Sequence, residues 1–368
     1  MRRLAPLAGL ALLAALPWLI GSAYYVNIAS QILIAAVFAL GLNVLVGYGG
    51  LVSLGHAGLF GMAAYAAAWM IATAGAGHLV AALAALGATL LTAAVFAVLA
   101  LRATGIGFLM ITLALGQILW GVAYRWIELT NGDNGISVPG RPAPFGLQLE
   151  APTPFYYATL LVLAATLGAM AIFVRSPFGA SLRGTRDQPR RMSALGHNVW
   201  GIRFFAFLFS GFWSGVAGLL YFYYNEFVSP HVLSLGNSAE ALLMVISGGT
   251  GTLLGPIVGA ALVVVMKNVA SAYIERWNFL LGAIFVAIVM LMPEGLVPGS
   301  VRLWRWAVSR RAATPEPART PLPPPAGAGR DGGTPQAGRR PSPASPHPPP
   351  PQAGEGLAAP MAEEEARR

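Results

Sequence analysis

The fold is decided by the stretch from Ser181 to Tyr221, which reads SLRGTRDQPRRMSALGHNVWGIRFFAFLFSGFWSGVAGLLY. Its first half is polar and sets a single acid, Asp187, against four arginines: Arg183, Arg186, Arg190 and Arg191. Its second half enters an apolar run over 204–224, which matches the roughly 20 residues that a helix needs to cross a bilayer core. A cationic segment followed by such a run predicts a transmembrane helix with a cytoplasmic flank.

The composition of the whole chain is that of a polytopic membrane protein. Of its 368 residues, 56% are hydrophobic and 10% are charged, whereas soluble domains carry about 25% charged residues. The sequence contains no cysteine, which excludes disulfides and cysteine metal sites. The formal charge of +9 comes from arginines clustered between apolar runs. Because membrane topology explains that pattern, we expect the lipid bilayer and no nucleic acid as a partner.

Apolar runs recur along the chain at the length of membrane spans. We predict spans at 4–22, 26–46, 53–74, 79–100, 105–124, 155–174, 204–224 and 278–293. The first is interpreted as an uncleaved anchor, because its apolar part is longer than the apolar region of a signal peptide, which has roughly 7–15 residues. Glycines interrupt the region 239–272, and two broken passes or a re-entrant hairpin both fit it. The prediction is an all-α bundle of about 8–10 spans.

Arginine clusters indicate the orientation of the bundle. Residues 1–3, the loop 175–203 and the segment after 293 are rich in arginine, so we expect all three, and both termini, in the cytoplasm. The loop 125–153 then lies outside. Within it, TNGDNGI (130–136) predicts tight turns, since adjacent Asn and Gly favour positive φ.

Two parts of the chain differ in composition. The transmembrane domain is placed at 1–307. A Pro-, Gly- and Arg-rich cytoplasmic tail at 308–368 is predicted to be disordered, because it can bury too little apolar surface to offset the entropy of ordering.

Motifs of the common enzyme classes are missing from the sequence. It contains no G-x-x-x-x-G-K-[ST], H-E-x-x-H or G-x-S-x-G, so we expect neither a P-loop nor a zinc or serine hydrolase. We therefore predict no catalytic residue and no metal site. Glu240 is the one acid near the start of an apolar run, and this scarcity disfavours a proton- or sodium-coupled carrier.

The arginine-rich segment predicts a short helix over 188–195. Asp187 is expected to cap it, Pro189 to stand in its first turn and Gly196 to follow its end. A helix of two turns is only marginally stable in water, so we expect this one to be stabilised by docking onto a partner. A loop that merely obeys the positive-inside rule is the alternative.

The break GGTGTLLGP makes 247–256 the best candidate for a pathway or gate. Irregular backbone at membrane depth is tolerated only where protein buries it or where it lines a water-filled cavity. The pathway or gate candidates are Asn43, Ser53, His56, Gln117, Glu240, Gly248, Gly249, Thr250, Gly251 and Pro256. For His56 a structural hydrogen bond is favoured over a pathway role.

Small residues four apart predict close helix packing. Three such sets are Ser53, Ala57 and Gly61; Ser210, Ser214 and Gly218; and Gly251, Gly255 and Gly259.

Several longer motifs carry a family resemblance. They are GLNVLVGYGGLVSLGHAGLFGMAAYAAA from Gly41, TGIGFLMITLALGQILW, TNGDNGISVP, the stretch from Ser176 to Tyr221, and ALLMVISGGTGTLLGPIVGAAL. Together, over roughly 25–298, they closely resemble the M-type (LivM-like) permease subunits of branched-chain amino-acid ABC importers. The tail lies outside this resemblance.

The resemblance implies a machine with several subunits in the bacterial inner membrane. Its members pair with a second, H-type permease, two cytoplasmic ATPase subunits that bind ATP–Mg, and a periplasmic substrate-binding protein, while the permease itself carries no cofactor. Matched to the family's coupling region are Arg183, Arg186, Asp187, Pro189, Arg190, Arg191, Leu195 and Gly196. The cargo is expected to be branched-chain amino acids. Urea, short amides or small carboxylates are the alternative, as is an autonomous secondary carrier.

Overall fold

The computed structural model describes residue 9 and residues 13–18, 21–138, 140–141, 151–273, 277–292, 294–300 and 302. These all belong to one compact unit that ends at residue 313. Most of the predicted span 4–22, the arginines at 2 and 3, and the tail 308–368 lie outside the described residues.

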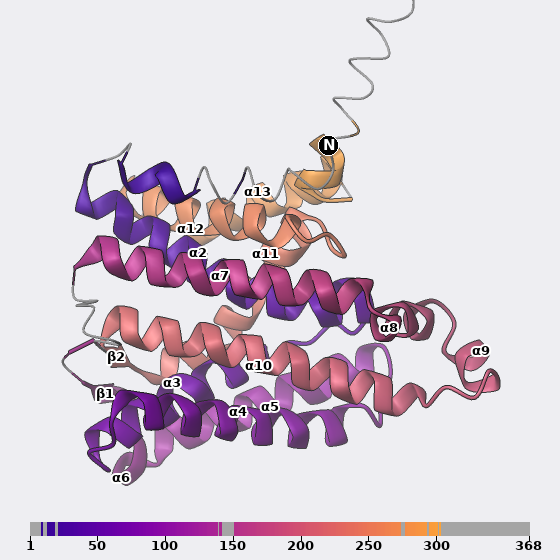
Figure 1. Cartoon of the computed structure of the whole chain (residues 1–368), viewed down its shortest axis with the longest axis horizontal. Helices are drawn as coiled ribbons and strands as arrows, with labels where there is room; N and C mark the ends of the chain where they lie inside the picture. Colours follow the sequence, from indigo (N-terminus) through magenta and orange to yellow (C-terminus); the bar gives the residue numbers. More distant parts are fainter. Residues whose placement is uncertain are drawn as a thin grey trace, which may run out of the picture. The chain divides into compact units, whose positions relative to one another are not determined.

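Long apolar helices pack side by side, as Figure 1 shows. The long helices are α2 (Ala23–Asn43), α3 (His56–Ala72), α4 (His78–Ala100), α5 (Ile106–Arg125), α7 (Pro152–Arg175), α10 (Val199–Asn225), α12 (Gly255–Tyr273) and α13 (Trp277–Leu291). Among the described residues, five segments are long and apolar enough to cross a membrane. The predicted all-α bundle is therefore confirmed, while the total number of crossings stays a prediction.

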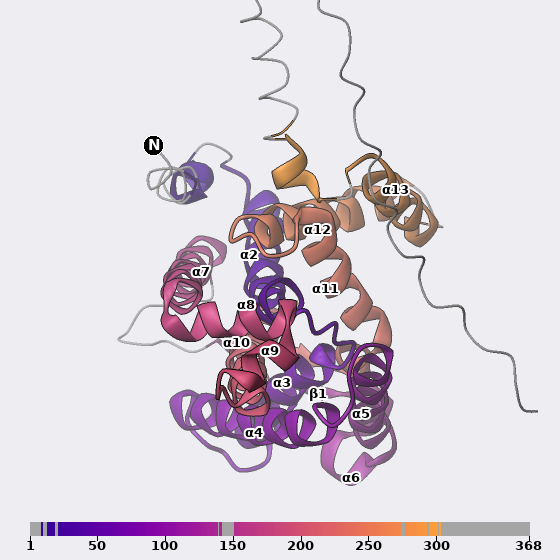
Figure 2. The same ribbon diagram turned by 90° about the vertical axis from the view of Figure 1, so that its right-hand side faces the viewer.

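Helix α2 is the centre of the bundle. The most apolar window of Ala23–Gly49 is 83% buried, against 22% for α5, so α2 is enclosed by protein and α5 lies at the periphery. Figure 2 shows α2 between α7, α10 and α12, which are the helices that it contacts most. Its apolar residues, such as Leu33 and Leu40, are almost fully buried. Burial on all sides accounts for a helix without a polar face.

Helix α2 ends in a widened π turn over Val44–Gly49. The chain leaves this turn at Gly50, whose φ of +67° is the left-handed conformation that glycine adopts without strain. Gly50 also leaves room for Arg186, because a Cβ there would lie 2.8 Å from the Arg186 Cγ. Turns of this kind are rare and are concentrated at functional sites.

The two ends of the bundle are marked by different elements. At one end lie α8 (Pro177–Asp187) and α9 (Pro189–Ala194), on the right in Figure 1. At the other end, β1 (Ile136–Ser137) pairs antiparallel with β2 (Phe227–Val228). We call these the α8 end and the β end.

The connection that precedes β1 contains α6 (Ile127–Thr130) and a 3₁₀ turn over Gly132–Asn134. Asn131, Gly132 and Gly135 have φ of 61°, 59° and 69°, which confirms the predicted tight turns with positive φ. The pairing of β1 with β2 was not predicted, because it joins segments about 90 residues apart in the chain.

The interrupted region 239–272 forms two antiparallel helices, α11 (Leu235–Gly248) and α12. Gly248 at the end of α11 faces Gly255 at the start of α12, while Glu240 near the start of α11 contacts Lys267 late in α12. The break therefore lies at the α8 end, beside the last turns of α2. With 14 residues, α11 is about 21 Å long, shorter than the roughly 30 Å of a bilayer core.

Two predicted small-residue sets are wrong in part. Ser53 does not share a helix with Ala57 and Gly61, because Gly55 precedes the first residue of α3 and Ser53 lies in the connection before it. Gly251 likewise lies in the turn between α11 and α12, with a φ of +74°.

The remaining small residues pack helices within the chain. A Cβ on Gly218 would overlap the Phe60 carbonyl oxygen of α3, and one on Gly259 would overlap the Met244 carbonyl oxygen of α11. A Cβ on Gly61 would lie 2.5 Å from Leu233 of the 3₁₀ turn Pro230–Leu233. Glycine at these positions allows the close backbone approach that small-residue spacing favours.

Candidate functional site

The arginine-rich segment contains two helices rather than one. Helix α8 begins at Pro177, after Ser176, whose hydroxyl accepts a hydrogen bond from the Gly179 N–H at 3.2 Å. Asp187 is the last residue of α8, so its predicted role as the cap of the next helix is wrong. Helix α9 follows Gln188, which makes no side-chain capping bond. Gly196 has a φ of +83° just after α9, as a residue that ends a helix requires.

The arginines of α8 bind backbone carbonyls of neighbouring segments. The Arg183 guanidinium donates to the Val174 carbonyl at 2.9 Å, in the last turn of α7, and that of Arg186 donates to the Gly47 carbonyl of the π turn. From α10, Arg203 donates to the Thr185 carbonyl of α8 at 3.0 Å. Helix ends leave carbonyls without intrahelical partners, and these cations satisfy them. They thereby attach α8 to the ends of the bundle helices.

Helix α9 presents a different surface. Arg190 and Arg191 are exposed, as are Pro189 and Gly196, and the Leu195 side chain is 68% exposed. Met192 holds α9 to α8, because a Cβ on Gly184 of α8 would lie 2.7 Å from its sulfur. The result is a cationic surface with one exposed leucine, supported on α8.

The turn between α11 and α12 is tied to the end of α2 by Asn43. Its side chain donates to the Thr252 carbonyl at 2.8 Å and accepts from the Gly251 N–H at 3.0 Å. Within the turn, the Thr252 hydroxyl donates to the Gly249 carbonyl at 2.8 Å and accepts from the Gly255 N–H at 3.0 Å. These bonds replace the helical bonds that the break removes, and buried backbone groups need such partners.

The π turn and this broken turn touch directly. A Cβ on Gly47 would overlap both the Gly251 nitrogen and the Asn43 Oδ1, so the two backbones are in contact beside the Asn43 side chain. On the other side of the broken turn, a Cβ on Gly249 would lie 2.7 Å from Pro298. Gly47 therefore contacts the broken turn and, through its carbonyl, Arg186 of α8. Of the predicted pathway or gate residues, this cluster gathers Asn43, Gly248, Gly249, Thr250, Gly251 and Pro256.

His56 belongs to a closed hydrogen-bond network. Its Nδ1 lies 2.8 Å from the Ser53 hydroxyl and its Nε2 lies 2.9 Å from the Ser210 hydroxyl. Ser210 donates to the Gly41 carbonyl at 2.6 Å, so its oxygen accepts from His56 and the ring proton is assigned to Nε2. Both ring nitrogens are occupied in a fully buried side chain, which leaves His56 no atom to offer a solute.

Glu240 lines a cavity of about 260 Å³ whose lining comes mainly from α2, α10, α11 and α12. The Lys267 ammonium lies 3.1 and 3.2 Å from its two carboxylate oxygens. Sequence reasoning missed Lys267, because only the antiparallel arrangement of α11 and α12 brings residues 27 positions apart together. Gln117 lines a separate cavity with Trp120 and Tyr124, so it does not join Glu240.

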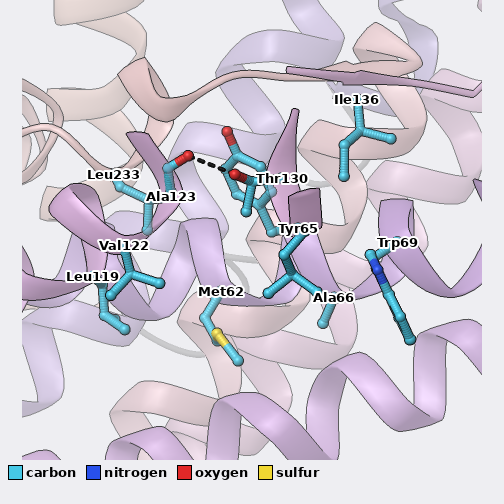
Figure 3. A pocket seen from close by; sticks show the side chains of 11 residues that line it. Met62, Tyr65, Ala66, Trp69, Leu119, Val122, Ala123, Thr130, Ile136 and Leu233 are labelled. Atoms are coloured by element: carbon cyan, nitrogen blue, oxygen red, sulfur yellow. Dashed lines mark hydrogen bonds between the residues drawn. The ribbon is translucent and has the colours of Figure 1, made fainter. Parts of the chain in front are cut away.

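A third cavity, of about 320 Å³, is apolar. Figure 3 shows its lining from α3, α5 and α6, with the 2.7 Å bond from the Thr130 hydroxyl to the Ala123 carbonyl drawn as a dashed line. Its other lining residues include Met62, Leu119 and Val122. The described lining residues include no charged side chain, so they offer nothing to pair with an ionic solute.

The described residues contain no group of three or more His, Cys, Asp or Glu side chains that would hold a metal ion.

Comparisons with known proteins show that the sequence is similar to those of transport proteins. The model of the family described as the permease component of branched-chain amino acid transport systems matches residues 24–289. The chain is 30% identical over 300 residues to the high-affinity branched-chain amino acid transport system permease protein LivM of Salmonella typhimurium, and likewise to that of Escherichia coli K12, covering 74% of this chain and 70% of each relative.

A second type of permease is also similar. The LivH permease protein of Escherichia coli K12 is 22% identical over 185 residues, covering 47% of this chain and 59% of that protein. No solved structure matches the chain.

Proposed function

Since the chain belongs to the branched-chain amino acid transport permease family, we propose that it is the membrane subunit of an ABC importer that carries branched-chain amino acids into the cytoplasm. It is a multi-pass membrane protein, and its relatives are transport permeases rather than enzymes. In this proposal it resides in the bacterial inner membrane, and the α8 end and both termini face the cytoplasm. The arginine-rich loop supports that orientation.

The proposed partners follow from the two kinds of relative. Similarity to both LivM and LivH supports pairing with a second permease of related sequence. The chain itself contains no P-loop motif, so ATP–Mg would bind to two separate ATPase subunits at the cytoplasmic side. A periplasmic binding protein would deliver the amino acid to the β end.

One observation carries the coupling mechanism. Helix α8 is bonded through Arg186 to the π turn of α2, and the π turn contacts the turn between α11 and α12 at Gly251. An ATPase that pulls on α8 and α9 would therefore move the end of α2 and the broken turn together. Coupling between sites needs such a contiguous element with two arrangements, and the Asn43 side chain, bonded to Gly251 and Thr252, ties the end of α2 to the broken turn.

The two helices divide the work in this proposal. Arg183 and Arg186 attach α8 to the bundle, whereas Arg190, Arg191 and Leu195 on and just after α9 are free of such internal anchoring and offer a cationic, partly apolar contact to an ATPase. This division accounts for the excess of arginine in the segment better than the positive-inside rule alone, because two of its four arginines donate hydrogen bonds to backbone carbonyls.

The test is a charge reversal of Arg190 and Arg191 to Glu in tagged chain expressed with its partners. We expect the ATPases to be lost from the purified complex and leucine uptake to fall, while leucine binding by the periplasmic protein is unchanged. Arg102→Glu is the matched control, since Arg102 is an exposed arginine that follows α4 at the α8 end and lies outside α8 and α9. Equal loss of ATPase in the control would assign the effect to topology and contradict the docking role.

A further inference from the structure

The cavity around Glu240 combines features that suit one class of solute. Among its described lining residues, the acid is Glu240 and the ammonium is Lys267, with side chains 22% and 43% exposed, so a solute that enters can reach both. Charged side chains among apolar helices are costly and mark solute pathways more often than packing sites. Lys267 is the one lysine in the chain and interrupts the apolar run VVVMKNVA of α12.

The remaining lining divides into a polar and an apolar part. On the polar side, the Asn268 amide donates to the Gln31 side chain at 3.2 Å, and the Gln31 amide donates to the Tyr224 hydroxyl at 3.1 Å. On the apolar side stand Phe38, Phe60 and Met244, among others. A mostly apolar lining with a few converging polar groups is the usual character of a small-molecule site.

From this arrangement we propose that the Glu240–Lys267 pair is a binding station for a zwitterionic amino acid. This inference rests on the proposed function and names the residues that contact the cargo. The α-carboxylate of the solute binds the Lys267 ammonium, its α-ammonium binds the Glu240 carboxylate, and its aliphatic side chain lies against the apolar wall. The solute replaces one ion pair by two, so the charge of the cavity stays balanced before and after binding.

The exchange also explains why binding here is weak enough for release. Each charged group of the solute must displace a partner that is already paired at 3.1–3.2 Å, so the net gain is a small difference between similar interactions. A solute with only one charge would break the Glu240–Lys267 pair while offering a new partner to just one of the two groups, which is unfavourable among apolar helices. The station therefore selects zwitterions over amines and carboxylic acids of the same shape.

Protection of Lys267 from acylation tests the station directly. In the reconstituted complex, the chain's single lysine is acylated by an amine-reactive ester and its peptide is quantified by mass spectrometry. An added lysine-containing reference peptide corrects for reagent that the amino acid consumes. Leucine at ten times its half-saturating concentration should slow acylation about tenfold, because the free fraction falls as 1/(1 + [L]/Kd). Neither 4-methylpentanoate nor 3-methylbutylamine should protect.

Neutral variants separate binding from a purely structural ion pair. Glu240→Gln and Lys267→Met each remove one member of this ion pair, whereas the double variant removes both. If the pair were structural, the double variant would regain normal uptake. For a binding station we expect the double variant to assemble normally and to lose roughly tenfold or more in leucine uptake efficiency. Glu226→Gln is the matched control at the β end, since its carboxylate pairs with Arg141 outside this cavity.

The outcomes for the two proposals are distinct. Wild-type uptake with no protection of Lys267, or normal uptake by the double variant, would overturn the station and leave the import function standing. Protection of Lys267 by leucine in a complex that imports no leucine would support the station and refute the import function.

Discussion

Gly47 and Gly49 allow the contact between α2 and the broken turn to be tested with one methyl group. A Cβ on Gly47 would overlap the Gly251 nitrogen and lie 2.7 Å from the Gly251 Cα, so Gly47→Ala must separate two backbones. A Cβ on Gly49, in the same π turn, would have its nearest atoms at 3.6 Å, which is ordinary contact. Both glycines are buried, so the two alanine variants differ mainly in the space that each methyl group meets.

The magnitude follows from the steric conflict. Overpacking of a filled interior costs about 1–3 kcal/mol, and the methyl group would meet the Gly251 backbone and the Asn43 Oδ1, which is itself held by hydrogen bonds to the broken turn. At roughly 2–4 °C per kcal/mol for a protein of moderate size, the thermal transition of Gly47→Ala should fall about 2–12 °C below that of Gly49→Ala. Because the broken turn is displaced, leucine uptake by the reconstituted complex should also fall in Gly47→Ala alone.

The assay compares thermal unfolding of the two purified variants in detergent and their ATP-driven uptake in proteoliposomes. Equal transitions and equal uptake in Gly47→Ala and Gly49→Ala would refute the reasoning, since they would mean that the π turn and the broken turn are not in contact in the working protein.

Three further predictions concern single residues. Asn43→Ala leaves the Gly251 N–H and the Thr252 carbonyl without their side-chain partner, so it should destabilise the protein by about 1–3 kcal/mol and lower leucine uptake. Thermal unfolding and transport assays measure the two effects, and an unfolding temperature equal to that of the wild type would contradict the prediction. His56→Leu should lower the unfolding temperature yet leave uptake per folded complex within about twofold, because both ring nitrogens of His56 are hydrogen-bonded within the chain. Complete loss of uptake in folded complex would indicate a pathway role instead. Gly218→Ala should lower the yield of folded protein in gel filtration, since its methyl group would overlap the Phe60 carbonyl. Gly168→Ala is the control, because a methyl group there meets open space and should leave the yield as in the wild type. Similar yields of the two variants would disprove the close approach of α3 and α10.

Helix positions were predictable wherever an apolar run alone decides them. The predicted spans 79–100 and 105–124 agree with α4 and α5 to within one residue at each end, because hydropathy and length suffice there. The turns at Asn131 and Gly135 were equally predictable, since the preference of Asn and Gly for positive φ is local.

Other features depend on contacts between distant segments. Helix α8 was missed because its polar composition resembles a loop, and what stabilises it is the burial of Leu182 and the bonds of its arginines to distant carbonyls. The π turn of α2 was not predicted either, and the close approach of Gly47 to Gly251 is a contact between distant segments of the chain. No spacing rule could join Asn43 to Thr252, which are 209 residues apart.

Several residues of the candidate site were named from the sequence, but their arrangement was not. Asn43, Glu240 and the glycines of the broken turn were named from the sequence, yet they divide into two places. One is the contact region at the α8 end and the other is the charged cavity toward the β end. Ser53 was assigned to the wrong element, because the start of α3 is set by Gly55 rather than by the apolar pattern.

The central claim is that Arg186 transmits ATPase movement to the end of α2, and Arg186→Ala tests it most directly. The measurement is the ratio of leucine imported to ATP hydrolysed by the reconstituted complex, with subunit content checked by gel filtration. Loss of a hydrogen bond to a charged group is worth about 1.5–3 kcal/mol, so we expect an intact complex whose ratio falls roughly tenfold or more while hydrolysis continues. An unchanged ratio in an intact complex would contradict the account.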